Sequence, residues 1–159
     1  MRTVIESMTT ALASDEQFMA WCRDNLGSMP TIAYEPEIPT EGVPDSMYPF
    51  VFLYGVKISG PSSMAVELGI GVRNDAAPQT DTVTSRVHGA ETVVQRETST
   101  GLLLALSMYL QAVDVIHRMK LGSVEPSGET GSTVLHPYYE AWGTIAATWP
   151  HTTARQKGR

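Results

Sequence analysis

The sequence predicts an α+β fold: a mainly antiparallel or mixed sheet of about four to five strands, with helices packed on one face. Three observations lead to this prediction. The segments Phe50–Ile58 and Met64–Arg73 alternate apolar and polar residues and are joined by the turn "SGPSS". The segment 98–120 has helical periodicity, and the segment 136–150 alternates again. Strands turn successive side chains to opposite faces, whereas helices repeat about every 3.6 residues, so the two patterns identify the elements.

The size and charge of the chain limit its organisation. It has 159 residues and a formal net charge of −6, which fits a single domain. We expect residues 1–150 to form this α+β domain, including a proline-rich arm at 28–48, and residues 151–159 to be a flexible basic tail. Because the remainder is strongly acidic, we expect no sequence-specific nucleic-acid partner, since such partners are held largely by phosphate contacts.

The first part of the chain predicts helices. Residues 3–13 are expected to form a short helix. Ser14 opens "SDEQFMAWCRDNLG", and Gln17 follows three residues later, which is the pattern of a capping box. Apolar residues then recur at helical spacing until Gly27, a residue type that commonly ends helices.

Residues 28–48 are expected to be an extended arm. Five prolines lie between positions 30 and 49, and proline removes a backbone donor that a sheet needs. Only one short strand fits, around Thr31–Tyr34. With few apolar anchors, the arm is expected to be partly disordered in the free subunit and to become ordered on assembly.

The second strand of the predicted hairpin has two different faces. One face carries Met64, Val66, Leu68, Ile70 and Val72, and the other carries Ala65, Glu67, Gly69, Gly71 and Arg73. The apolar face predicts burial against a helix. The other face, with two glycines and opposite charges, is open to a neighbour or to solvent.

The middle of the chain predicts one further strand region and one long helix. Thr82–Val87 and Thr92–Gln95 are weaker strand candidates for the sheet. Thr98–Lys120 is the strongest helix, with Ser99 or Thr100 as N-cap and Gly122 as a candidate C-cap.

The long helix is expected to be the core helix. We expect its stripe of Leu106, Tyr109, Val113 and Ile116 to pack on Val66, Leu68 and Ile70. Gln111 and Asp114 interrupt the apolar sequence, so no membrane span is expected.

The last part of the chain predicts a connection followed by a strand. "SVEPSGETGSTV" is rich in Gly, Pro and Ser and is expected to be a turn-rich connection. "HPYYEAWGTIAATWP" alternates and is expected to be the closing strand. Its aromatic residues have two possible roles. They could form a stacking platform for a ligand, or they could belong to the core or to an interface. These residues are Tyr138, Tyr139, Trp142 and Trp149.

No catalytic, cofactor-binding or metal motif is complete. "GIGVRN" lacks the third glycine of a dinucleotide loop, and "GETGST" lacks the lysine of a phosphate loop. No histidine has a second ligand at zinc spacing. Cys22, the single cysteine, lies in a helical apolar pattern and is expected to be buried rather than nucleophilic. We therefore expect a protein that is not an enzyme and needs no cofactor or metal.

The order of the elements resembles the tail terminator, or tail completion, proteins of long-tailed bacteriophages. The resemblance rests on a helical region ending "WCRDNLG", the proline-rich arm, the hairpin "YPFVFLYGVKI" with "SMAVELGIGV", the helix "STGLLLALSMYLQAVDVIHRMK" and the strand "HPYYEAWGTIAATW". It implies a structural virion protein of the tail, assembled in the host cytoplasm. Such proteins form a homo-oligomeric ring, here expected to be a hexamer, that caps the tail tube and joins it to the head connector.

A ring requires an interface, and the sequence offers one candidate surface. Glu67, Gly69, Gly71 and Arg73 form the expected subunit interface, because glycines permit close backbone approach and opposite charges set the register. A plain solvent-exposed sheet face is the equal alternative.

Other functions remain open at this point. Another head–tail joining or neck protein fits the same pattern. A small enzyme or ligand-binding domain would use His88, Glu91, His136 and Tyr138. A toxin–antitoxin or regulatory partner protein is the remaining alternative.

Overall fold

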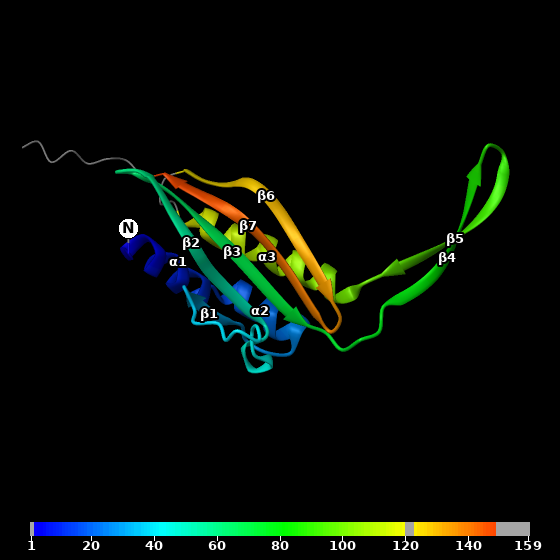
Figure 1. Cartoon of the computed structure of the whole chain (residues 1–159), viewed down its shortest axis with the longest axis horizontal. Helices are drawn as coiled ribbons and strands as arrows, with labels where there is room; N and C mark the ends of the chain where they lie inside the picture. Colours follow the sequence, from blue (N-terminus) through cyan, green and yellow to red (C-terminus); the bar gives the residue numbers. More distant parts are fainter. Residues whose placement is uncertain (1, 120–122, 149–159) are drawn as a thin grey trace, which may run out of the picture.

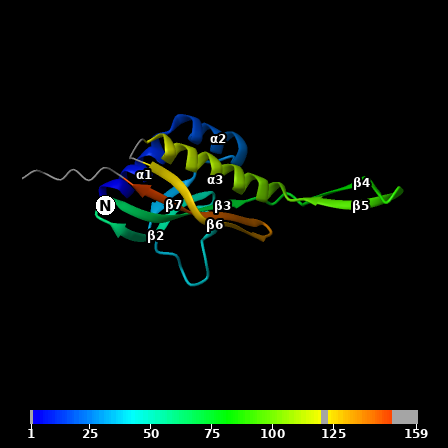
Figure 2. The same ribbon diagram turned by 90° about the horizontal axis from the view of Figure 1, so that it is seen from above.

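The computed structural model describes residues 2–119 and 123–148. Its body has two layers, a five-stranded sheet and a layer of helices that covers one face of it (Figures 1 and 2). The helices are α1 (Arg2–Ser14), α2 (Glu16–Leu26) and α3 (Thr100–Arg118). The strands are β1 (Thr31–Tyr34), β2 (Phe50–Gly60), β3 (Ser63–Arg73), β4 (Gln79–Val87), β5 (Ala90–Thr98), β6 (Ser123–Leu135) and β7 (Tyr138–Thr148). The predicted α+β class is confirmed.

The main sheet is mixed and has β3 at its centre. The strand order is β1-β2-β3-β7-β6, in which β1 lies parallel to β2 and every other neighbouring pair is antiparallel. The alternation predicted for β3 is present, since Val66, Leu68 and Ile70 are fully buried beneath the helices. The opposite side of the sheet, which we call the open face, carries the proline-rich arm instead of helices (Figure 2).

The N-terminal helices are confirmed, but the predicted cap is wrong by one residue. Asp15, not Ser14, begins α2: its carboxylate accepts a hydrogen bond from the Phe18 amide at 2.8 Å. The Ser14 hydroxyl instead donates to the Thr10 carbonyl within α1, also at 2.8 Å. An ionised carboxylate suits a helix N-terminus better than a hydroxyl does, because it also meets the positive end of the helix dipole. Gly27 ends α2 with a φ of 76°, as expected.

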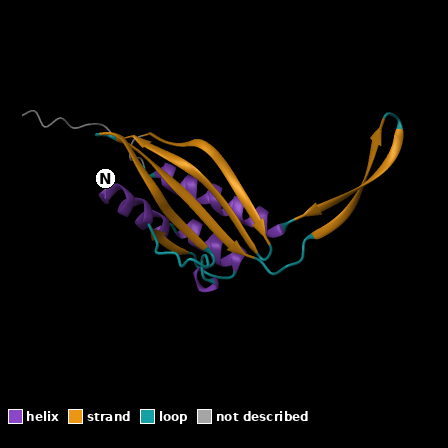
Figure 3. Ribbon diagram, in the orientation of Figure 1, coloured by secondary structure: helices purple, strands orange, loops and turns teal. Residues whose placement is uncertain are grey.

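The two weaker strand candidates form a separate ribbon and are not part of the main sheet. β4 and β5 pair only with each other and project away from the body (Figures 1 and 3). A two-residue turn at His88 and Gly89, both with positive φ, joins them. The expectation of a further strand in the sheet is therefore wrong. On the face of the ribbon whose side chains the structure describes, the exposed threonines Thr80, Thr82 and Thr84 make a mainly polar surface that does not suit packing beneath the helices.

The predicted turn-rich connection is wrong as well, since residues 123–135 form the edge strand β6. It pairs with β7 along its length, with a register shift between Ser127 and Thr130. An edge strand tolerates the glycines and the single Pro126 because only one of its sides needs a complete set of backbone hydrogen bonds. The closing strand, β7, is confirmed.

The core face of α3 differs from the predicted stripe. Tyr109 and Ile116 are buried as expected, and Val113 packs partly buried against the core. Leu106 is 38% exposed, so its predicted core position is wrong. The buried residues of α3 are Gly101, Ala105, Met108, Tyr109, Ala112, Val115 and Ile116. The small Ala105 and Ala112 bring the helix close to the sheet, which moves its axis and leaves Leu106 at the edge of the contact.

The start of α3 is as predicted, with Ser99 as the N-cap that accepts a hydrogen bond from the Leu102 amide. The candidate C-cap Gly122 lies outside the described residues. Among the described helices, α3 is the one whose length and composition would suffice to cross a membrane. One side of it is packed on the sheet, as in a core helix.

Candidate functional site

The open face of the sheet is shaped by two rows of residues that cross β2, β3 and β7. In one row Phe52, Gly69 and Trp142 are neighbours, and in the next Phe50, Gly71 and Glu140 are neighbours. Large side chains therefore stand on both outer strands while the central strand has none. This arrangement leaves space over β3 that side chains of β2 can cover.

The two glycines are covered by aromatic rings of the same chain. A Cβ at position 71 would overlap the Phe50 ring, and a Cβ at position 69 would lie 2.9 Å from Tyr54 Cε1. Both glycines are buried. Their absent side chains thus serve packing within a single chain. A role in a subunit contact would have to act through the rings that cover them.

Arg73 anchors the proline-rich arm. Its guanidinium contacts the Asp45 carboxylate at 2.9 Å and the Asp75 carboxylate at 3.2 Å. The Tyr138 hydroxyl donates to the other Asp45 oxygen at 2.6 Å. These contacts raise the pKa of Arg73, chiefly through the hydrogen bond to Asp75, and raise the pKa of Tyr138, chiefly through the hydrogen bond to Asp45. The residue predicted to contact a neighbour therefore already binds the arm of its own chain.

Aromatic packing supplies a second anchor for the arm. The Tyr48 ring lies 5.0 Å from the Phe50 ring and 5.2 Å from the Tyr138 ring, measured between centroids. The Phe50 and Phe52 rings are stacked at 4.2 Å. The arm thus has apolar anchors that its proline content did not reveal. Its predicted disorder in the free subunit stays a prediction.

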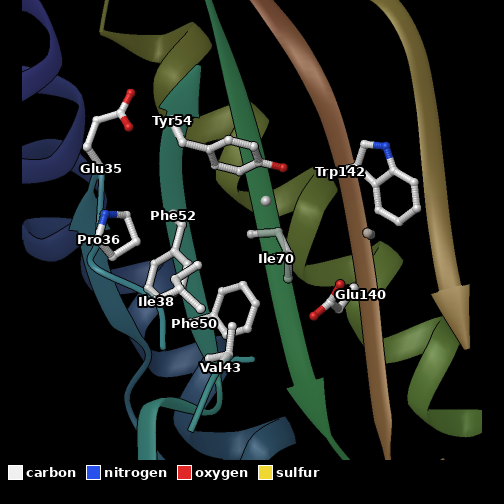
Figure 4. Close-up of a pocket in the computed structure, with 12 residues that line it drawn as sticks. Glu35, Pro36, Ile38, Val43, Phe50, Phe52, Tyr54, Ile70, Glu140 and Trp142 are labelled. Carbon is white, nitrogen blue, oxygen red and sulfur yellow. The ribbon is translucent and has the colours of Figure 1, made fainter. Parts of the chain in front are cut away.

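A cavity of about 320 Å³ lies between the arm and the open face. In Figure 4 the Tyr54 ring reaches from β2 over β3, whereas the Trp142 indole points from β7 toward β6, where it covers Gly131. Phe50, Phe52 and Gly69 also line the cavity, and Glu35 and Glu140 supply carboxylates. Among the described residues that line it there is no lysine, arginine or histidine. We call this cavity the aromatic pocket.

Carboxylates give the aromatic pocket a negative field. The pKa of Tyr54 is raised by burial first, and then by the negative charges of Glu67 and Glu140. Glu67 is half-buried, and a Cβ at Gly55 would lie 3.2 Å from its Cδ. Of the four residues of the predicted interface, Gly69 lines the pocket and Glu67 acts on it electrostatically, whereas Arg73 and Gly71 lie further along β3.

The alternative set of four polar residues is not assembled. His88 lies in the turn of the projecting ribbon, with Glu91 close to it in β5. His136 lies in the turn between β6 and β7, in the body, where its Nδ1 is 2.9 Å from the Tyr139 hydroxyl. Tyr138 is occupied by Asp45. Figure 1 shows the β6–β7 turn at the end of the body from which the ribbon projects, and the ribbon turn at the tip of that projection, away from the body.

The predicted aromatic platform is also divided between the two sides of the sheet. Tyr138 and Trp142 lie on the open face, whereas Tyr139 is buried on the helix side beside Gly101. Trp149 lies outside the described residues. Sequence reasoning missed Phe50, Phe52 and Tyr54 as site residues, although each faces or flanks a glycine of β3 in the register of the hairpin.

A second concave surface lies between α3 and β6. Leu106 and Leu110 line this groove of about 550 Å³ together with Thr130, Gly131 and Ser132. Leu103, Leu106 and Leu110 are 53%, 38% and 66% exposed and occupy successive turns of one side of α3. We call these three residues the leucine stripe. An apolar stripe of this kind marks a surface that another chain can cover.

Buried reactive groups do not form a further site. Cys22 is fully buried, and burial raises the pKa of its thiol to about 12, which disfavours the nucleophilic thiolate. The described residues contain no group of three or more His, Cys, Asp or Glu side chains placed to hold a metal ion.

Comparisons of the chain with protein-family models, with curated proteins and with solved structures gave no match.

Proposed function

We propose that the chain is a subunit of a closed homo-oligomeric ring, and that the ring is the tail terminator of a long-tailed bacteriophage. In that role it caps the tail tube and joins it to the head connector. The order of the sequence elements resembles that family, as described above. The observation that carries the ring itself is the projecting β4–β5 ribbon.

The ribbon is poorly supported within its own chain. An isolated two-stranded hairpin is marginally stable in water. The described side chains of β4 and β5 are exposed, among them Val93 at 68%, and the ribbon projects into solvent (Figures 1 and 3). Packing against another copy of the chain would stabilise it.

A ring also needs a second, different surface on each subunit. Closed cyclic assemblies use heterologous contacts, in which one patch of a subunit meets another patch of its neighbour. The leucine stripe and the adjoining groove provide an apolar patch distinct from the ribbon. The pairing of a projecting element with an exposed apolar groove is the geometry that such contacts require.

The mass of the purified protein across a range of concentrations tests the ring. Sedimentation velocity should show a species of several times 17.3 kDa, and electron micrographs should show rings. A variant in which residues 79–98 are replaced by Gly-Gly should remain folded and monomeric. The conservative variant Lys57→Arg, on the exposed edge of β2, serves as a control that still forms rings. A wild-type protein that stays monomeric at every concentration and on tail tubes would contradict the proposal.

The phage assignment needs its own experiment. Antibodies against the chain should label one end of the tail tube in virions from the genome that encodes it. Rings without such labelling would support assembly but not the tail role. Label at the neck but not on the tube end would favour the related head–tail joining proteins.

A further inference from the structure

The aromatic pocket is complete within one subunit and has not been used in the argument for the ring. Its walls come from four separate parts of the chain: the arm, β2, β3 and β7. Tyr54 reaches over β3 into it, and Trp142 lies at its rim with the indole ring over Gly131 of β6 (Figure 4). A cavity of about 320 Å³ is large enough for one side chain or one small molecule.

The carboxylates at the pocket lack cationic partners. Among the described residues, none of Glu35, Glu67 and Glu140 forms an ion pair. Glu35 accepts a hydrogen bond from the Gly55 amide at 3.0 Å, and Glu140 accepts one from the Tyr48 hydroxyl at 3.4 Å. Arg73, which lies on β3 like Glu67, forms its ion pairs with Asp45 and Asp75 instead.

Aromatic faces beside unpaired carboxylates select a cation. The face of an aromatic ring is negative, and Trp gives the strongest attraction to a cation placed over it. The Trp142 indole covers Gly131, and the residue is 36% exposed, so part of the ring surface remains accessible at the rim. A guanidinium group fits such a site better than an ammonium group, because it is planar, weakly hydrated, stacks on rings and binds carboxylates through two parallel hydrogen bonds.

The rim of the pocket indicates how the cation is presented. Ile38, in the arm, is 47% exposed beside the opening. A single exposed ion pair contributes little in water, so a bound cation gains most when the chain that carries it also covers this apolar rim. We propose that the aromatic pocket binds an arginine side chain of another polypeptide, with Glu140 as the ion-pair partner and Trp142 as the stacking surface.

Short peptides test this on the protein alone, whether or not it forms rings. The probes are acetyl-Gly-Arg-Gly-amide and its citrulline counterpart, which has the same shape but no charge. Binding is followed by the indole N–H signal of Trp142, assigned by its loss in Trp142→Phe. The arginine peptide should bind saturably and about tenfold more tightly than the citrulline peptide, a ratio that corresponds to about 1.4 kcal/mol. The lysine peptide should bind more weakly than the arginine peptide.

Two variants separate a specific site from general attraction to an acidic protein. Glu140→Gln keeps the shape of the side chain and should weaken the arginine peptide severalfold without changing citrulline binding. Glu91→Gln removes one charge from the ribbon and should leave both affinities unchanged. Equal binding of the arginine and citrulline peptides, equal effects of the two variants, or no saturable shift would overturn the proposal. Preserved amide spectra of both variants establish that they are folded.

Discussion

The Phe50 ring lies directly over Gly71, its partner across the β2–β3 pair, so that a side chain at position 71 would overlap it. The same relationship, less tight, joins Tyr54 to Gly69. Glycine in a strand weakens it, but a ring from the neighbouring strand can cover the bare backbone and restore buried apolar area. The glycines of β3 are thus part of the packing of one subunit.

Gly71→Ala tests this directly. We expect the free energy of unfolding to fall by about 1–3 kcal/mol, the usual cost of overpacking a filled site. Gly69→Ala should cost less, because Tyr54 is half-buried and its ring can shift. Urea unfolding of the monomer measures both. The second substitution Phe50→Leu should restore part of the stability lost in Gly71→Ala. If Gly71→Ala left the monomer unchanged and only impaired assembly, the glycine would belong to an interface instead.

The corrected phase of α3 predicts losses of stability of different size for two residues separated by half a turn. Met108 is fully buried, so Met108→Ala should cost about 2–5 kcal/mol. Leu106→Ala should cost clearly less, because its side chain is 38% exposed. Chemical denaturation gives both values. Leu106→Ala should instead reduce self-association, which sedimentation detects, if the leucine stripe is covered in the ring.

The N-cap of α2 gives a matched pair of neighbouring residues. Asp15→Ala should destabilise the protein by about 1–2 kcal/mol, since it removes the bond to the Phe18 amide. It also removes the 3.1 Å contact with Arg118. Ser14→Ala removes only a hydroxyl bonded within α1 and should change thermal stability little. A larger loss of stability in Ser14→Ala than in Asp15→Ala would indicate that Ser14 is the cap after all.

Cys22 predicts how stability depends on pH in the alkaline range. Burial raises the pKa of its thiol to about 12 in the folded chain, against about 8.5 in an unfolded one. Below about pH 8.5 the thiol is protonated in both states, and its contribution to stability is fully present. As the pH rises from there toward 12 the unfolded state loses its proton first, so stability falls by up to about 1.4 kcal/mol per pH unit.

The matched variant for this effect is Cys22→Ala. Its stability should fall less steeply than that of the wild type between pH 9 and 11, because the tyrosines titrate in both proteins and cancel in the comparison. Denaturant unfolding at a series of pH values supplies the curves. Parallel curves for the two proteins would show that the thiol is not the group responsible.

The anchors of the proline-rich arm predict a graded pattern of amide exchange. The Tyr48 amide bonds to the Asp45 carbonyl at 3.1 Å, and Asp45 is held by Arg73 and Tyr138. We expect slower exchange around residues 45–48 than around residues 37–42, most of which are exposed. Asp45→Ala should accelerate exchange in the first segment. Uniform fast exchange across the arm would support the earlier expectation that it orders only on assembly.

The elements that could be predicted from the sequence are those whose own pattern determines them. β3 and β7 alternate, β2 begins with an apolar run of the length of a buried strand, and Gly27 marks a helix end by its chemistry. β6 could not be predicted, because an edge strand tolerates Gly, Pro and Ser and loses its sequence signal. The phase of α3 was ambiguous, since Leu102, Leu103, Leu104 and Leu106 fit several stripes, and only the close approach at Ala105 decides between them.

The candidate site shows the same limit. Glu67, Gly69, Gly71 and Arg73 share one face, as the alternation of β3 predicted. What covers that face depends on contacts between residues far apart in sequence, such as Asp45 with Tyr138. Local patterns carry no information about such contacts. The aromatic pocket was therefore invisible until β2, β7 and the arm were brought together.

The position of β7 in the sheet has a consequence for synthesis on the ribosome. β7 lies between β3 and β6, and within the described part of the chain β6 pairs with no other strand. A nascent chain that has reached Leu135 therefore leaves β6 without a partner and β3 with an open edge. Open apolar edges invite pairing between chains. The body cannot close until Tyr138–Thr148 has emerged, so chaperones that shield nascent strands should bind this chain late in its translation.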